Sequence, residues 1–73
     1  MEEETFEDKA EADSFIECMI KSAARSGYSI KVKEPRRVPC IQQNTGTVKF
    51  KWLVEFSGIT KIYAILLCRD APN

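Results

Sequence analysis

Thr47-Val-Lys-Phe-Lys-Trp-Leu-Val-Glu-Phe56 is the stretch that decides the fold class, because its apolar and polar residues alternate. One side carries Val48, Phe50, Trp52, Val54 and Phe56, and the other carries Thr47, Lys49, Lys51, Leu53 and Glu55. Side chains along a strand point alternately to opposite faces of the sheet. The stretch therefore predicts a central β-strand with its aromatic side turned toward a core.

A helix is predicted ahead of this strand, between Asp8 and Gly27. Asp8 is followed three residues later by Glu11, which resembles a capping box, and the acidic residues there suit the positive end of a helix dipole. Apolar residues recur every three or four positions and predict one buried stripe: Ala12, Phe15, Ile16, Met19, Ile20 and Ala23. Gly27 ends the helix, since glycine adopts the left-handed cap conformation without strain.

Two segments between the helix and the central strand are predicted from alternation and turn residues. Residues 28–33 alternate between apolar and polar side chains, which predicts a first strand that ends at Glu34-Pro35. Residues 34–46 form either an irregular connection or, as we prefer, a short strand over Val38–Gln43. In that case Asn44-Thr45-Gly46 closes a hairpin onto the central strand, with glycine at the left-handed position.

Ser57-Gly58 predicts a turn into a final strand, Thr60–Cys68. The register depends on the loop length: a two-residue loop turns Lys61 inward, whereas a three-residue loop turns Ile62, Ala64, Leu66 and Cys68 inward. We prefer the three-residue loop, because it leaves the lysine in water. The predicted outer face then consists of Ser29, Lys31, Lys33, Lys49, Lys51, Leu53, Glu55, Lys61, Tyr63, Ile65 and Leu67.

The elements together predict an α+β fold, with one N-terminal helix packed on one face of a three- to four-stranded, mostly antiparallel sheet. The length of 73 residues allows one domain. We expect residues 1–7 to be a flexible acidic segment, residues 8–69 to form the domain, and residues 70–73 to be a short tail.

Charge is divided unevenly along a chain whose net charge is zero. Residues 1–17 contain eight acids and one base, whereas the remainder contains ten bases and three acids. The three cysteines have no Cys-x-x-Cys spacing and there is no histidine, so we expect free thiols, no metal site and no cofactor. No signal peptide or membrane span is recognisable, which predicts an intracellular protein, cytoplasmic or nuclear.

The first functional hypothesis is protein–protein contact through the sheet face that the helix leaves open. Four outer residues form an apolar patch there, with two arginines on the nearby 34–46 loop: Leu53, Tyr63, Ile65, Leu67, Arg36 and Arg37. The patch is expected to bind a second copy or another protein that the chain modulates or inhibits. Alternatively, the acidic N-terminal segment with Phe6, or the loop itself, covers this face within one molecule.

The alternative hypothesis is nucleic-acid binding by the basic side of the same face. Its residues are Lys31, Lys33, Lys49, Lys51, Lys61 and Tyr63, with Arg36 and Arg37 nearby. A helix followed by three strands is similar to the first part of the double-stranded-RNA-binding domain, although no second helix with a basic start is predicted after Cys68. Residues 2–8 are expected to screen the basic face until an anionic partner displaces them.

Catalysis is the class that the sequence favours least. The chain has no histidine to move protons near neutral pH, and its three glycines are separated and already assigned to turns and caps. No cysteine has a recognisable base partner nearby in the sequence. The sequence therefore predicts a small regulatory binding protein that is not an enzyme.

Overall fold

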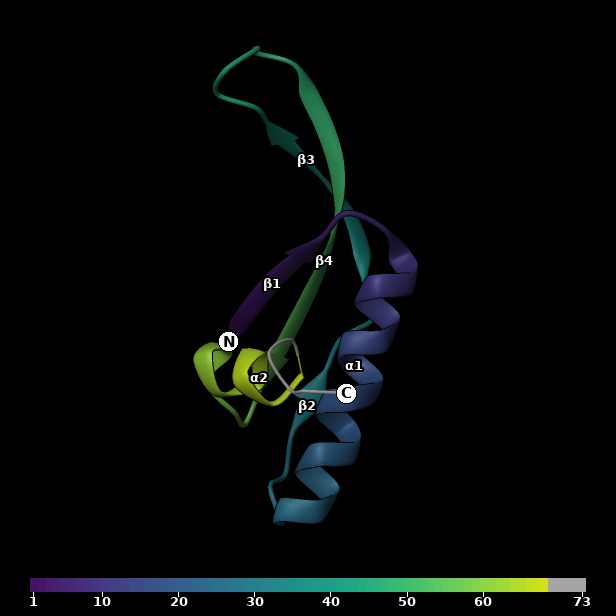
Figure 1. Cartoon of the computed structure of the whole chain (residues 1–73), viewed down its shortest axis with the longest axis vertical. Coiled ribbons are helices and arrows are strands. Elements are labelled where there is room, and N and C mark those ends of the chain that lie inside the picture. Colours follow the sequence, from purple (N-terminus) through teal and green to yellow (C-terminus); the bar gives the residue numbers. More distant parts are fainter. Residues whose placement is uncertain (69–73) are drawn as a thin grey trace.

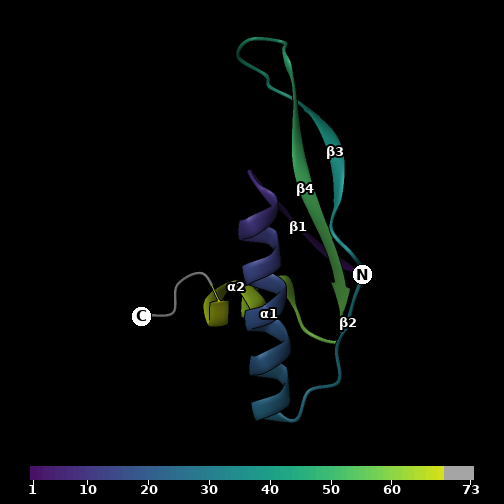
Figure 2. The same ribbon diagram turned by 90° about the vertical axis from the view of Figure 1, so that its right-hand side faces the viewer.

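Two helices lie on one face of a four-stranded antiparallel sheet in the part of the chain that the structure describes, residues 1–68 (Figures 1 and 2). The structure is a computed structural model, and it confirms the α+β class and the packing of the N-terminal helix on the sheet. The elements in chain order are β1 (Glu2–Phe6), α1 (Lys9–Ser26), β2 (Lys31–Val32), β3 (Arg36–Ile41), β4 (Val48–Ser57) and α2 (Lys61–Cys68). The predicted tail at 70–73 lies outside the described residues.

β4 is the centre of the sheet, as the alternation of its sequence predicted. It pairs with β1 along one edge and with β2 and β3 along the other, antiparallel in each case. β1 therefore runs parallel to β2 and β3 with β4 between them, and α1 connects the two edges in a split β-α-β arrangement. β4 is therefore the strand that joins β1, β2 and β3 into one sheet.

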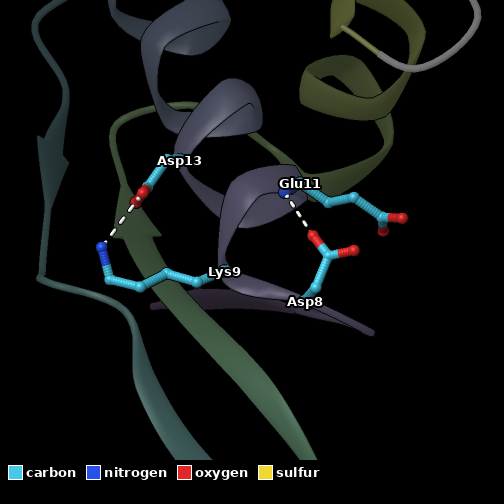
Figure 3. Close-up of polar contacts among 4 residues, drawn as sticks. All are labelled: Asp8, Lys9, Glu11 and Asp13. Atoms are coloured by element: carbon cyan, nitrogen blue, oxygen red, sulfur yellow. Dashed lines mark hydrogen bonds and ion pairs between the residues drawn. The ribbon is translucent and has the colours of Figure 1, made fainter.

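The predicted start and end of α1 are confirmed. The Asp8 carboxylate accepts a hydrogen bond from the Glu11 backbone N–H at 2.9 Å, and Lys9 pairs with Asp13 at 3.0 Å (Figure 3). Gly27 caps the other end with a φ of 78°. The stripe is narrower than predicted, because Ile20 is 51% exposed.

Aromatic rings join three elements in the core. Phe6 of β1 lies 5.0 Å from Phe15 of α1, and Phe15 lies 6.0 Å from Phe56 of β4, measured between ring centroids. Met19 and Val54 are fully buried beside them. This cluster fixes α1 over the half of β4 that is paired with β1.

The sequence analysis expected residues 1–7 to be a flexible segment. This is wrong for residues 2–6, which form β1. Three consecutive glutamates have a low β-propensity, and here the pairing with β4 overrides it. Phe6 is 5% exposed and anchors the strand in the core. The Glu2 carboxylate accepts a hydrogen bond from the Lys61 backbone N–H at 2.9 Å, so β1 also holds the start of α2.

The prediction of a final strand over Thr60–Cys68 is wrong, because Lys61–Cys68 forms α2. A short run of apolar residues on both sides does not distinguish a buried strand from a helix. The Thr60 hydroxyl accepts from the Tyr63 N–H at 3.3 Å and, with Glu2, satisfies two N–H groups at the helix start. Helical spacing buries Ala64 but leaves Ile62 75% and Leu66 56% exposed, so neither predicted register applies.

The segment from 28 to 46 contains two strands, as predicted, but with different bounds. The first strand is limited to β2, two residues long. A hairpin forms, as we preferred, but β3 covers Arg36–Ile41 rather than Val38–Gln43. Its loop is longer than the predicted Asn44-Thr45-Gly46, because the Gln42 N–H donates to the Thr47 carbonyl at 2.9 Å. The similarity to double-stranded-RNA-binding domains assumed a helix followed by three strands. In this chain the strand β1 comes before α1, so that order of elements does not apply.

Neither helix within residues 1–68 combines the length and the apolar character needed to cross a membrane.

Candidate protein-contact surface

The structure does not assemble the apolar patch expected on the open sheet face. Leu53 lies on that face and is 8% exposed, paired between Thr5 of β1 and Arg36 of β3. The other three members, Tyr63, Ile65 and Leu67, are on α2, which packs on α1 on the opposite side of the sheet (Figure 2). Leu67 packs against the core, and the Tyr63 ring lies 5.8 Å from that of Tyr28.

The predicted basic set is also divided. Lys31, Lys33, Lys49 and Lys51 share the sheet face opposite the helices, as their register with β4 requires. The remaining two members, Lys61 and Tyr63, are on α2 and do not join them.

Carboxylates interleave with the cations of that face. Glu7, directly after β1, lies 2.8 Å from the Lys49 ammonium and 3.6 Å from that of Lys51. Both lysines lower the pKa of the Glu7 carboxyl below its ordinary value of 4.5, and the hydrogen bond from Lys49 has the largest effect. Glu55 contacts Arg36 at 2.7 Å and Lys33 at 3.8 Å.

The β3–β4 hairpin projects beyond α1 and β1 (Figures 1 and 2). β1 pairs only with residues 52–56 of β4, so residues 48–51 pair with β3 alone within the described part of the chain. The molecule measures 43 Å along its longest axis and 25 Å and 19 Å across. We call residues 36–53 the arm and the other described residues the body.

One side of the arm is apolar and exposed. Ile41 is directly opposite Val48, and Pro39 is directly opposite Phe50, so these four side chains share one face, which we call the apolar face of the arm. Ile41 is 73% exposed, Val48 57% and Phe50 51%. The same face of β4 continues into the core, where Val54 and Phe56 are fully buried.

An arginine lies over the aromatic member of this face. The Arg37 guanidinium is 5.0 Å from the centroid of the Phe50 ring, within the distance of a cation–π contact. Arg37 is directly opposite Trp52, the half-buried residue that marks the base of the arm. Arginine and aromatic side chains are enriched among the residues that contribute most to protein–protein binding.

Charge distinguishes the arm from the rest of the chain. The arm contains four bases and no acid, namely Arg36, Arg37, Lys49 and Lys51, whereas the other residues contain seven bases and eleven acids. The net charge of zero is thus the sum of a basic arm and an acidic remainder. This division differs from the one at Glu17, because six of the ten bases that follow Glu17 in the sequence lie outside the arm.

The sequence analysis identified Val48 and Phe50 as one row but assigned that row to the core. The missing information was the reach of α1 and β1, which cover only the second half of β4. Pro39 and Ile41 were in the segment whose structure was left open. Val38, Pro39, Cys40 and Ile41 are all apolar, so this segment carried no alternation that could separate its two faces.

The Cys68 thiol offers little nucleophilic chemistry. Burial, with a further contribution from the neighbouring Cys18 thiol, raises the pKa of Cys68 to about 12, so this thiol stays protonated near neutral pH. Cys18 is half-buried rather than fully exposed, with its sulfur 3.9 Å from the Leu67 carbonyl oxygen. Within residues 1–68 no three histidine, cysteine, aspartate or glutamate side chains are grouped to hold a metal ion.

No family model, curated protein or solved structure matches the chain in comparisons with known proteins.

Proposed function

We propose that the chain is a non-catalytic binding protein that acts through protein–protein contact, with the apolar face of the arm as its contact surface. The observation that carries this proposal is the exposure of Ile41, Val48 and Phe50 side by side on a projecting hairpin. With side chains of roughly 150–200 Å² each, these three expose about 300 Å² of apolar surface. The largest apolar patch on a typical monomer is about 300–600 Å², and such patches are often functional.

The surroundings of the patch also favour a protein partner. The patch has an arginine stacked on its aromatic residue, and it continues without a break into a rigid core. A contact surface with an apolar centre and a polar rim is the usual anatomy of a protein interface. Regulation or inhibition of the partner is part of the proposal, as is an intracellular location with free thiols at Cys18, Cys40 and Cys68.

The experiment compares two substitutions of the same residue type at matched exposure. Ile41 in the arm is 73% exposed and Ile62 on α2 is 75% exposed, so Ile41→Glu and Ile62→Glu introduce the same charge without removing core contacts. Each variant and the original chain are immobilised and exposed to a lysate of the source organism, and the captured proteins are quantified by mass spectrometry. We expect Ile41→Glu to lose the specific captured protein and Ile62→Glu to keep it.

The reverse pattern would place the contact on α2 and contradict the proposal. Equal capture by all three chains would contradict any role of the exposed apolar residues. Circular dichroism of each variant verifies that the fold is retained.

Nucleic-acid binding remains a second candidate, favoured by the absence of acids from the arm and by Lys31 and Lys33 on the same sheet face as Lys49 and Lys51. Glu7 occupies two of these lysines at exposed positions, where ion pairs are weak and easily displaced. Fluorescence anisotropy with a short labelled oligonucleotide tests this function. Salt-sensitive binding that is stronger in the Glu7→Gln variant would support nucleic-acid binding. No binding at low salt would contradict it.

A further inference from the structure

Two of the three cysteine side chains meet where α2 packs on α1 (Figure 2). Cys18 belongs to α1 and Cys68 is the last residue of α2, and their thiols are in hydrogen-bond contact. The Ser22 hydroxyl, one turn along α1, lies 4.0 Å from the Cys18 sulfur and also hydrogen-bonds the Cys68 thiol. The Cys18 sulfur lies 3.9 Å from the carbonyl oxygen of Leu67, so the backbone that leads into Cys68 is held beside it.

We propose that Cys18 and Cys68 form a reversible disulfide, which locks α2 onto α1 when a small-molecule disulfide oxidises the chain. Two sulfur atoms in hydrogen-bond contact have to approach to about 2 Å to bond, and side-chain rotation with a small shift of α2 brings them there. In a reducing environment both residues stay free thiols, which is their state in this structure. The inference does not depend on the proposed function, because neither residue belongs to the arm.

The sheet keeps the third cysteine away from this pair. Cys40 of β3 is directly opposite Lys49 of β4, so the two side chains share the face that the helices leave open. In the unfolded chain Cys40 would be the preferred partner, because it is 22 positions from Cys18 and 28 from Cys68, whereas Cys18 and Cys68 are 50 positions apart. The fold therefore selects the pair that the unfolded chain favours least.

Protonation decides which sulfur reacts first, since each of the two residues lines a surface pocket. Burial, with a further contribution from the adjacent Cys18 thiol, raises the pKa of Cys68 to about 12, which leaves Cys18 to supply the attacking thiolate. In the first step the Cys18 thiolate bonds to one sulfur of the small disulfide, and the other sulfur leaves as a thiolate. The product is a mixed disulfide at Cys18.

The second step closes the disulfide within the protein. The contribution of Cys18 to the raised pKa of Cys68 needs a charge on the Cys18 sulfur, and the mixed disulfide has none, while the Ser22 hydroxyl still lowers that pKa. Cys68 gives its proton to the thiolate already released and attacks the Cys18 sulfur. The second half of the small disulfide leaves and takes up the proton that Cys18 had lost to water. Two protein thiols are thus oxidised by two electrons, and the small disulfide is reduced to two thiols.

Treatment of the reduced chain with oxidised glutathione, followed by alkylation and mass spectrometry without a reductant, tests the proposal. The folded chain should lose about 2 Da, with tryptic peptides 10–21 and 62–69 joined and Cys40 alkylated. Half-oxidation should need roughly tenfold less oxidised glutathione than formation of the mixed disulfide in Cys68→Ser, because the second step takes place within one molecule. Cys40→Ser keeps both proposed partners and should oxidise like the original chain.

Oxidation should also stabilise the packing of α2. A cross-link across this length of chain restricts the unfolded state, so the melting temperature should rise by roughly 10 °C or more and return after reduction. Amide exchange in α2 should slow in parallel. Cys18→Ser and Cys68→Ser should show neither change, and circular dichroism verifies that both variants are folded.

An unmodified chain, or a stable mixed disulfide at Cys18 without the joined peptides, would overturn the proposal. Peptides joined through Cys40 in the folded chain would overturn it as well. The urea-unfolded chain is the control for selection, and there the joined peptides should mainly contain Cys40. The same pattern in the folded and unfolded chains would show that the fold does not select the pair. The lysate experiment, carried out with a reductant present, tests the contact surface separately.

Discussion

Phe50 and Phe56 occupy the same face of the same strand, yet Phe56 is fully buried and Phe50 is 51% exposed. Phe56 lies in the body, where β1, β2 and α1 surround it. Phe50 lies in the arm, where the sheet has two strands and no helix covers it. The comparison teaches that alternation in a strand specifies which side is apolar, whereas the neighbouring elements determine whether that side is buried.

The energetic consequence is that the body stabilises the arm. A two-stranded ribbon is marginally stable in water, and three strands or a packed helix are needed for independent stability. Here the ribbon is an extension of β4, whose other half is fixed in the core. Arm residues are therefore available for binding without carrying the stability of the fold.

Paired phenylalanine substitutions test this division with the largest expected effect. Phe56→Ala should lower the free energy of unfolding by about 3–5 kcal/mol, because it leaves a cavity in a fully buried site, whereas Phe50→Ala should cost less than about 1 kcal/mol. Urea denaturation followed by circular dichroism measures both. Similar losses for the two variants would show that the arm contributes to the core.

A pair of glycines provides the second comparison. Gly58 has a φ of 95°, and an added Cβ would lie 2.3 Å from the Ser29 carbonyl oxygen, whereas Gly46 at the arm tip has a φ of 70° and open space around it. Gly58→Ala should destabilise the fold by about 3 kcal/mol and Gly46→Ala by about 1 kcal/mol. Alanine is strained at the positive φ of both positions, but only at position 58 does its Cβ collide with backbone. Thermal melting ranks them, and an equal loss would contradict the role of the close approach.

The capping aspartate gives an intermediate effect confined to the body. Asp8→Ala should cost about 1 kcal/mol, since the Glu11 N–H loses its acceptor, and Asp8→Asn should restore most of the stability because asparagine caps equally well. Amide exchange should accelerate in the first turn of α1. A loss in Asp8→Asn as large as that in Asp8→Ala would assign the effect to charge rather than to the hydrogen bond.

The smallest effect is expected at Glu7, which joins the body to the arm through Lys49 and Lys51. Its pKa is lowered from 4.5 in the folded state, so its contribution to stability is present above that value and is lost as the pH falls through the folded-state pKa. Glu7→Gln should reduce the stability change on acidification below about pH 4.5. High salt should also reduce the stability change on acidification in the original chain. A stability change confined to higher pH would exclude Glu7 as the source of the effect.

Residue patterns predicted the parts of the fold whose signals are local. The alternation in β4, the Asp8 cap and the end of α1 at Gly27 each depend on a few neighbouring residues, and the structure confirms them. It confirms the apolar stripe of α1 as well, except for the exposed Ile20. The hairpin between β3 and β4 follows from a glycine in a short loop. These features are predictable because backbone geometry and capping act within one or two turns of chain.

Distant contacts decided the remainder. Glu2-Glu3-Glu4 becomes a strand only because β4 offers it an edge, and Lys61–Cys68 becomes a helix beside α1 with its start held by Glu2, a residue 59 positions earlier. The predicted Leu53, Tyr63, Ile65 and Leu67 patch depended on a strand in that last segment, so it disappeared with the strand. In its place the candidate surface is at the arm, which no local pattern could separate from the core.

The sequence by itself determined an α+β chain with a central apolar strand face, a capped helix and an uneven distribution of charge, because these depend on residue spacing along the chain. Only the tertiary structure decided that α1 and β1 end halfway along β4, which separates a buried body from an exposed basic arm. The physical reason is that burial depends on which elements meet in space, and the same alternating side chains are core or contact surface according to what lies above them.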